Sequence, residues 1–168
     1  FTKQPSDSFI SHPMKLVTYS TPSISTRMGA VQNGVVYDLG AAAKAAGESI
    51  ATTVRGLLEQ GEAGLAAANR ALAHAVKTGA AGTPEAGVTF HAPLGDPPKI
   101  LCLAGNYQAH IQEGGGQAVN KPKITPRVFS KPITTLCGHK SPILLPEISN
   151  HVDYELEVAF VIGKPGKL

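Results

Sequence analysis

The sequence predicts an α+β protein, in which a small N-terminal α/β domain is followed by an incomplete mixed β-roll. Three observations predict this fold class. Near the start, Asn-Gly stands between two apolar runs, which is typical of a β-hairpin. An Ala-rich stretch with helical periodicity comes next. After residue 98, short apolar runs alternate with Gly- and Pro-rich turns, as expected for strands of a sheet.

The N-terminal domain is expected to span residues 14–94. Strands are expected at 14–19, 28–31 and 35–39, with the last two joined by the turn Gln32-Asn33-Gly34. Helices are expected at 41–46, 53–60 and 63–77, because apolar residues recur there at spacings of three and four and glycines follow each run. Residues 1–13 precede the first methionine and are expected to be a tail or a cloning remnant.

The second part, residues 95–168, is expected to be the first portion of a roll. Its strands are expected at 100–104, 127–130, 143–145 and 154–162. The sequence stops shortly after the last of these runs and its turn, so a truncation within the domain is expected.

Composition and charge exclude several classes of protein. The formal net charge is +3 and the basic residues are scattered, so we expect no nucleic-acid partner. No apolar stretch is long enough to span a membrane, and the first residues lack the pattern of a signal peptide. Cys102 and Cys137 show neither metal-ligand spacing nor a disulfide framework. A cytoplasmic location without membrane partners is the resulting expectation.

The segment His151–Gly163 carries the first candidate site. Side chains alternate along a strand, so Glu155 and Glu157 are expected on one face, with Cα atoms ~6.5–7 Å apart. Two carboxylates at this spacing can converge on a hard cation such as Mg²⁺, Mn²⁺ or Ca²⁺, which then needs a third protein ligand. The ordinary alternative is an acidic face in solvent. Ala159 and Val161 continue the same face and weigh against that alternative.

The second candidate site follows the apolar strand that ends at Ala104. Asn106 is expected to cap a short helix that ends at the three glycines from Gly114. On this helix His110 and Glu113 are three residues apart, so the carboxylate can orient the imidazole as a general base. A plain surface pair is the alternative. A phosphate-binding loop is disfavoured because no Gly-Lys-Ser/Thr follows the glycines.

The motifs of both candidate sites occur along the chain in an order that resembles the motif order of one family. A strand ending in Gly-Asn-Tyr-x-x-His-x-x-Glu is followed by Phe-x-Lys-Pro, then by Asp-Tyr-Glu-x-Glu, an apolar run and Val-Ile-Gly-Lys. This order resembles the fumarylacetoacetate hydrolase family over residues 99–167, and residues 14–94 are similar, with less specific motifs, to its smaller N-terminal domain. The resemblance implies a β-roll of the family type and a homodimer.

The resemblance also implies roles for individual residues. Glu155 and Glu157 match two of three acidic ligands for Mg²⁺ or Mn²⁺, and His110 and Glu113 match a catalytic pair on a mobile lid. Substrate contacts are expected from Lys131, the lysine of Phe-x-Lys-Pro, and from Tyr107. The third acidic ligand and a further catalytic lysine are expected beyond Leu168, so this chain alone is expected to be inactive.

The expected function is metal-dependent hydrolysis of a C–C bond in an acylpyruvate-type 2-oxo acid. Two alternatives stay open. One is an isomerase or decarboxylase of 2-oxo dicarboxylates in aromatic catabolism, which would use the same parts. The other is a non-catalytic binding module, in which the acidic strand is only a surface.

Overall fold

The computed structural model describes residues 14–117, 120–164 and 166. The contacts between residues divide the chain into two compact units. The first takes the residues up to Leu94 together with those from Cys137 onward, and the second is Gly95–Leu136. This division differs from the predicted domains, because the segment after Leu136 is grouped with the N-terminal unit.

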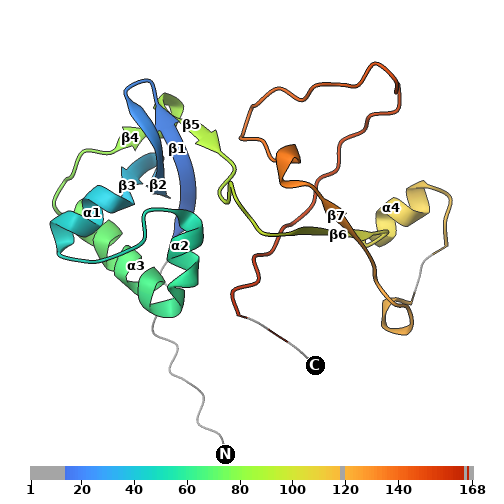
Figure 1. Ribbon diagram of the computed structural model, residues 1–168, viewed down its shortest axis with the longest axis horizontal. Helices are drawn as coiled ribbons and strands as arrows, with labels where there is room; N and C mark the ends of the chain where they lie inside the picture. Colours follow the sequence, from blue (N-terminus) through green and yellow to red (C-terminus); the bar gives the residue numbers. More distant parts are fainter. Residues whose placement is uncertain (1–13, 118–119, 165, 167–168) are drawn as a thin grey trace, which may run out of the picture. The chain divides into compact units, whose positions relative to one another are not determined.

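A curved antiparallel sheet and three helices form the ordered part of the first unit (Figure 1). All strand pairs are antiparallel, in the order β4-β3-β2-β1-β5. The strands are β1 Lys15–Thr21, β2 Ile24–Gln32, β3 Val35–Asp38, β4 Thr83–Pro84 and β5 Thr89–His91.

The predicted hairpin between β2 and β3 is confirmed. Gln32 pairs with Val35, so the loop holds only Asn33 and Gly34. Their φ values are 51° and 77°. Positive φ at both central residues matches the right-handed twist of the flanking strands, and asparagine and glycine reach it at low cost.

Two of the three helices begin at a side-chain cap that the sequence supplies. Helix α1, Leu39–Ala46, starts where the Asp38 carboxylate accepts a hydrogen bond from the Ala41 amide at 2.9 Å, and it ends at Gly47. Helix α2, Val54–Glu59, starts where the Thr53 hydroxyl accepts from the Gly56 amide. Helix α3 runs from Gly61 to Lys77. Side-chain acceptors satisfy amides that a helix start leaves without partners.

The core lies between the sheet and these helices. Its aliphatic side chains come from β2, α1, α2 and α3, and the buried members are Met28, Ala30, Leu39, Val54, Leu57, Ala68 and Leu72. Full burial of one such large aliphatic side chain stabilises the fold by about 1.5–3 kcal/mol. The expected apolar side of the third helix is confirmed at Ala68 and Leu72, which are buried there.

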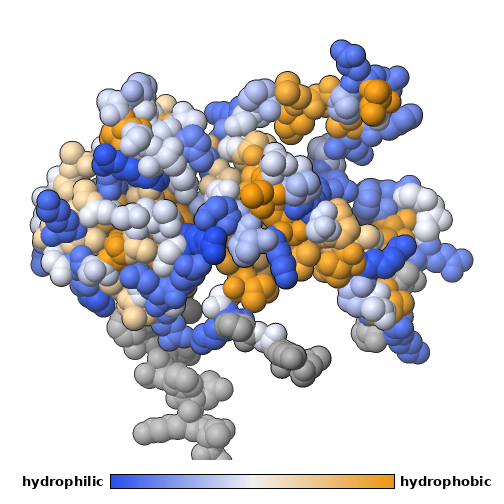
Figure 2. All heavy atoms as spheres, viewed as in Figure 1, coloured by the Kyte–Doolittle hydropathy of each residue, from blue (hydrophilic) through white to orange (hydrophobic). Residues whose placement is uncertain are grey.

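The second unit is built on a two-stranded antiparallel ladder. Strand β6, Ile100–Ala104, pairs with β7, Arg127–Lys131, and helix α4, Gln108–Glu113, follows β6 (Figure 1). Large apolar side chains of the ladder reach the surface, and Leu101 and Val128 are 63% and 55% exposed. Figure 2 shows hydrophobic residues on the visible surface of the molecule. An α+β architecture with antiparallel sheets is therefore observed, and a closed roll remains a prediction.

Two predicted strands are corrected. Residues 143–145 and 154–162 form neither strand nor helix. In a strand, Tyr154, Leu156 and Phe160 would lie on the face opposite Glu155 and Glu157, but they are 87%, 90% and 85% exposed. A strand is held by the backbone hydrogen bonds of a neighbour, and an apolar face needs a surface to pack on. No strand of the described residues pairs with either segment.

Among the helices in the described ranges, none combines the length and the apolar character that crossing a bilayer requires.

Candidate functional site

The junction between β6 and α4 presents the predicted catalytic helix. Gly105 turns the chain with a φ of 64°, a conformation that residues with a Cβ adopt rarely. Tyr107 is the N-cap residue of α4, with φ and ψ of −97° and 122°, and Gly114 is the C-cap. The prediction that Asn106 caps this helix is wrong by one residue, and the side chain of Tyr107 makes no capping hydrogen bond.

His110 and Glu113 lie together on this helix. The His110 Nδ1 atom is 3.7 Å from the Glu113 Oε2 atom. Their side chains are 70% and 77% exposed, so water screens the attraction between them. This contact turns one ring nitrogen of His110 toward the carboxylate and leaves Nε2 on the other side of the ring. The two groups therefore lie within ion-pair distance but beyond hydrogen-bond distance, and their catalytic role stays a prediction.

The two residues expected to contact substrate lie near opposite ends of the β6–β7 ladder. Tyr107 follows the Ala104 end, where Ala104 pairs with Arg127. Lys131 pairs with Ile100 at the other end, which is roughly 13 Å away along the strand at ~3.3 Å per residue. Both side chains are exposed. The structure thus places Tyr107 at the start of α4 and leaves Lys131 at a distance from that helix.

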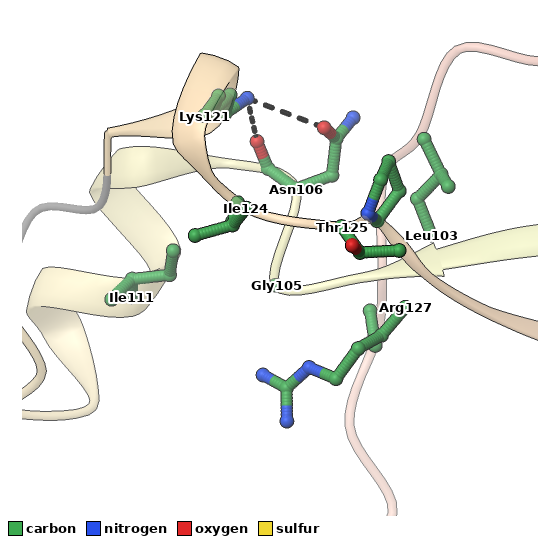
Figure 3. A pocket seen from close by; sticks show the side chains of 10 residues that line it. Leu103, Gly105, Asn106, Ile111, Lys121, Ile124, Thr125 and Arg127 are labelled. Atoms are coloured by element: carbon green, nitrogen blue, oxygen red, sulfur yellow. Dashed lines mark hydrogen bonds between the residues drawn. The ribbon is translucent and has the colours of Figure 1, made fainter.

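A small pocket of about 130 Å³ opens beside the same junction (Figure 3). Apolar side chains from β6, α4 and the segment before β7 line it together with Asn106, Lys121 and Arg127. The Lys121 ammonium group donates hydrogen bonds to the backbone carbonyl of Asn106 and to its side-chain Oδ1, the latter at 3.2 Å. This lysine therefore holds the residue at which the chain leaves β6 and enters α4.

Glu155 and Glu157, the predicted metal ligands, lie in the segment without regular secondary structure and are exposed. They belong to the first unit, whereas His110 and Glu113 belong to the second. In the ranges that the structure describes, no three side chains of His, Cys, Asp or Glu come close enough to hold a metal ion.

The donor chemistry of this pair nevertheless fits a hard divalent cation. Both groups are carboxylates, which are the donors that Mg²⁺ and Mn²⁺ prefer. Two carboxylates supply only part of a coordination shell, so the remaining ligands would come from water, substrate or residues outside the described ranges. Glu155 and Glu157 are thus suitable ligands that do not by themselves form a complete site.

Lys121 is the residue at this site that the sequence did not reveal. It lies in Asn-Lys-Pro-Lys, where an isolated lysine is ordinarily solvated. Its contact with Asn106 spans 15 residues. No local periodicity signals a contact of that kind, because it depends on how the loop between α4 and β7 returns to the strand.

Comparison with known proteins agrees with the motif order. The family model described as "Fumarylacetoacetate (FAA) hydrolase C-terminal" matches residues 99–168, which contain the α4 helix and both glutamates. The chain belongs to the fumarylacetoacetate hydrolase family.

The relatives in this family include several tautomerases. The chain is 37% identical over 157 residues to "Oxaloacetate tautomerase Fahd2a, mitochondrial" of Rattus norvegicus, covering 92% of this chain and 46% of that protein. It is 43% identical over 115 residues to "Oxaloacetate tautomerase FAHD2A, mitochondrial" of Homo sapiens, covering 68% of this chain and 34% of that protein. The chain spans about half the length, or less, of the curated relatives it matches. Membership of this enzyme family is therefore established, and a hydrolase activity in particular is not.

Proposed function

We propose that the protein containing this chain interconverts the keto and enol forms of oxaloacetate with the help of a divalent cation. The proposal rests on the proximity of His110 to Glu113, in a chain 37% identical over 157 residues to a protein named oxaloacetate tautomerase. From the sequence alone, hydrolase activity was the expected function and isomerase activity was an alternative. The names of the relatives favour the isomerase instead.

Keto–enol tautomerisation needs one group that moves a proton. The C3–H bond of the keto acid breaks, its electron pair forms the C2–C3 double bond, and the 2-oxo oxygen gains a proton. No oxidant or second substrate is required. Nε2 of His110 would accept the C3 proton, since the Glu113 carboxylate lies 3.7 Å away on the Nδ1 side of the ring and leaves Nε2 open to substrate.

Glu155 and Glu157 would hold the divalent cation. When bound, Mg²⁺ or Mn²⁺ supplies Lewis-acid polarisation of the 2-oxo group, which makes the C3 proton easier to remove. Tyr107, at the start of the catalytic helix, would contact the substrate. Lys131 would reach it only if the substrate extends along the ladder, and its role as a substrate contact is the weaker prediction.

Hydrolysis of an acylpyruvate is the second candidate, favoured by the description of the matching family model. It would use His110 and Glu113 to activate water rather than to move a proton on the substrate. The homodimer, the cytoplasmic location and the absence of nucleic-acid and membrane partners stay predictions. The names of the relatives assign those proteins to mitochondria.

Replacing His110 tests this proposal. In the natural full-length protein, His110→Ala should slow oxaloacetate tautomerisation by about 10²–10⁴-fold, the usual contribution of a positioned general base. The rate is followed by the loss of enol absorbance. The matched control is Gln112→Ala, an exposed residue of the same helix, which should keep the wild-type rate.

Equal rates for the wild type and His110→Ala would contradict the role of His110. A wild-type protein that fails to tautomerise oxaloacetate but cleaves an acylpyruvate would replace the proposal with the second candidate.

A further inference from the structure

The start of the catalytic helix is held from outside the helix by Lys121. Its ammonium group donates to both oxygen atoms of Asn106, the backbone carbonyl and Oδ1, as the two dashed lines in Figure 3 show. Asn106 directly precedes the N-cap residue Tyr107. The direction of the Asn106 carbonyl fixes the peptide plane that leads into α4. A side chain that binds this carbonyl therefore fixes the direction in which the helix leaves β6.

Packing contributes little to the stability of helix α4. It has six residues, none of them buried, and its N-cap side chain makes no capping hydrogen bond. Isolated helices of this length are unstable in water. Its C-terminal end is better held. The Gly116 amide donates to the Ile111 carbonyl at 2.9 Å, and the Ile111 side chain lines the pocket.

Lys121 is itself attached to the ladder that supports α4. It begins the short 3₁₀ helix Lys121–Lys123, and the chain then passes through residues 124–126 into β7. Arg127, the first residue of β7, pairs with Ala104, the last residue of β6. Lys121 therefore lies on the segment that leads into β7, and its side chain contacts Asn106 just after the end of β6.

We propose that Lys121 is a positioning residue that sets the orientation of α4 and, through it, the direction in which His110 and Glu113 face. The expected effect of Lys121 on turnover rests on the proposed function. Its expected effect on the orientation of α4 is independent of that function. A lysine on a 3₁₀ helix before β7, rather than a capping side chain of α4, thereby controls the alignment of the catalytic pair.

Hydrogen exchange tests the structural half without any assay of activity. In the natural full-length protein, Lys121→Met removes the charge and the donors but keeps most of the side chain. The amides of residues 111–113, which have acceptors within the helix, should then exchange about three- to tenfold faster, the loss expected for an exposed hydrogen bond from a charged donor. Lys121→Arg keeps a cationic donor and should restore most of the protection.

The matched control is Lys123→Met, on the same 3₁₀ helix. Lys123 is exposed like Lys121, and within the described ranges its ammonium group contacts no acceptor. Exchange in α4 should be unchanged in this variant. Equal exchange in the wild type and Lys121→Met would overturn the proposal, as would equal acceleration in both methionine variants.

Turnover separates positioning from direct substrate binding. A positioning role predicts that Lys121→Met lowers kcat for oxaloacetate with little change in KM, together with the faster exchange in α4. A lysine that binds a substrate carboxylate would instead raise KM and leave the exchange of the free protein unchanged, which contradicts the inference. If the wild type has no tautomerase activity, the proposed function fails, and the exchange data still decide whether Lys121 holds the helix.

Discussion

At the scale of single residues, the exposure of His110 and Glu113 shapes their chemistry. Their side chains are 70% and 77% exposed. Water at this exposure weakens the influence of a carboxylate on an imidazole, and a reaction that moves a proton from carbon benefits from a site closed to solvent. The pair is thus suitably arranged but open.

Glu48 and Arg70 give a prediction at this scale. The Arg70 guanidinium contacts both carboxylate oxygens of Glu48, at 2.6 and 2.8 Å, and this hydrogen bonding lowers the pKa of Glu48. Since the pKa is lower in the folded state, the pair stabilises the protein above the unfolded-state pKa of about 4.3 and loses that contribution as the pH falls through the folded value.

Glu48→Gln should therefore lower the thermal midpoint at neutral pH, and the difference from the wild type should shrink toward zero in acid. Thermal unfolding at a series of pH values checks this expectation. A difference that stays constant over the whole range would show that the pair does not titrate as argued.

At the scale of elements, local signals predicted the first unit well. The Asn33-Gly34 turn, the helix ends at Gly47 and near Lys77, and the apolar repeat that buries Ala68 and Leu72 all depend on residues close in the sequence. The segment around Glu155 was predicted less well. Its alternation of polar and apolar residues has the period of a strand, but period alone does not provide the neighbouring strand that a ladder requires.

In the candidate site too, contacts between residues close in the sequence were predicted, and contacts between distant residues were not. Helical spacing predicted that His110 and Glu113 come together, and a 3.7 Å contact is observed. The contact of Lys121 with Asn106, and the separation of Lys131 from α4, follow from chain return and ladder register. No single short motif predicts either property.

The hairpin turn gives a prediction for an element. Gly34 has a φ of 77°, and a Cβ there would meet no atom within 4 Å. Gly34→Ala should therefore destabilise the protein through backbone strain alone, by about 1–2 kcal/mol. Urea unfolding measures this change. Gly95→Ala is the control, because a Cβ there also meets no atom within 4 Å and its φ lies outside the left-handed region. If both variants unfold at the same urea concentration, the strain argument is wrong.

At the scale of the whole molecule, the residues with predicted roles are divided between the two units. The pair proposed to move a proton lies on α4 of the second unit, and the two carboxylates proposed as metal ligands lie in the exposed segment of the first. The large apolar side chains beside those carboxylates are 70–90% exposed. Such exposed apolar runs mark surfaces that bind other groups of the protein or a partner.

The most direct test of this account is the rate of oxaloacetate tautomerisation by the natural full-length protein as Mn²⁺ is titrated, beside the double variant Glu155→Gln/Glu157→Gln. We expect the wild-type rate to rise with Mn²⁺ and saturate, and the double variant to stay near the uncatalysed rate at every concentration. A rate that is independent of Mn²⁺ and equal in both proteins would contradict a metal-dependent site at these two carboxylates.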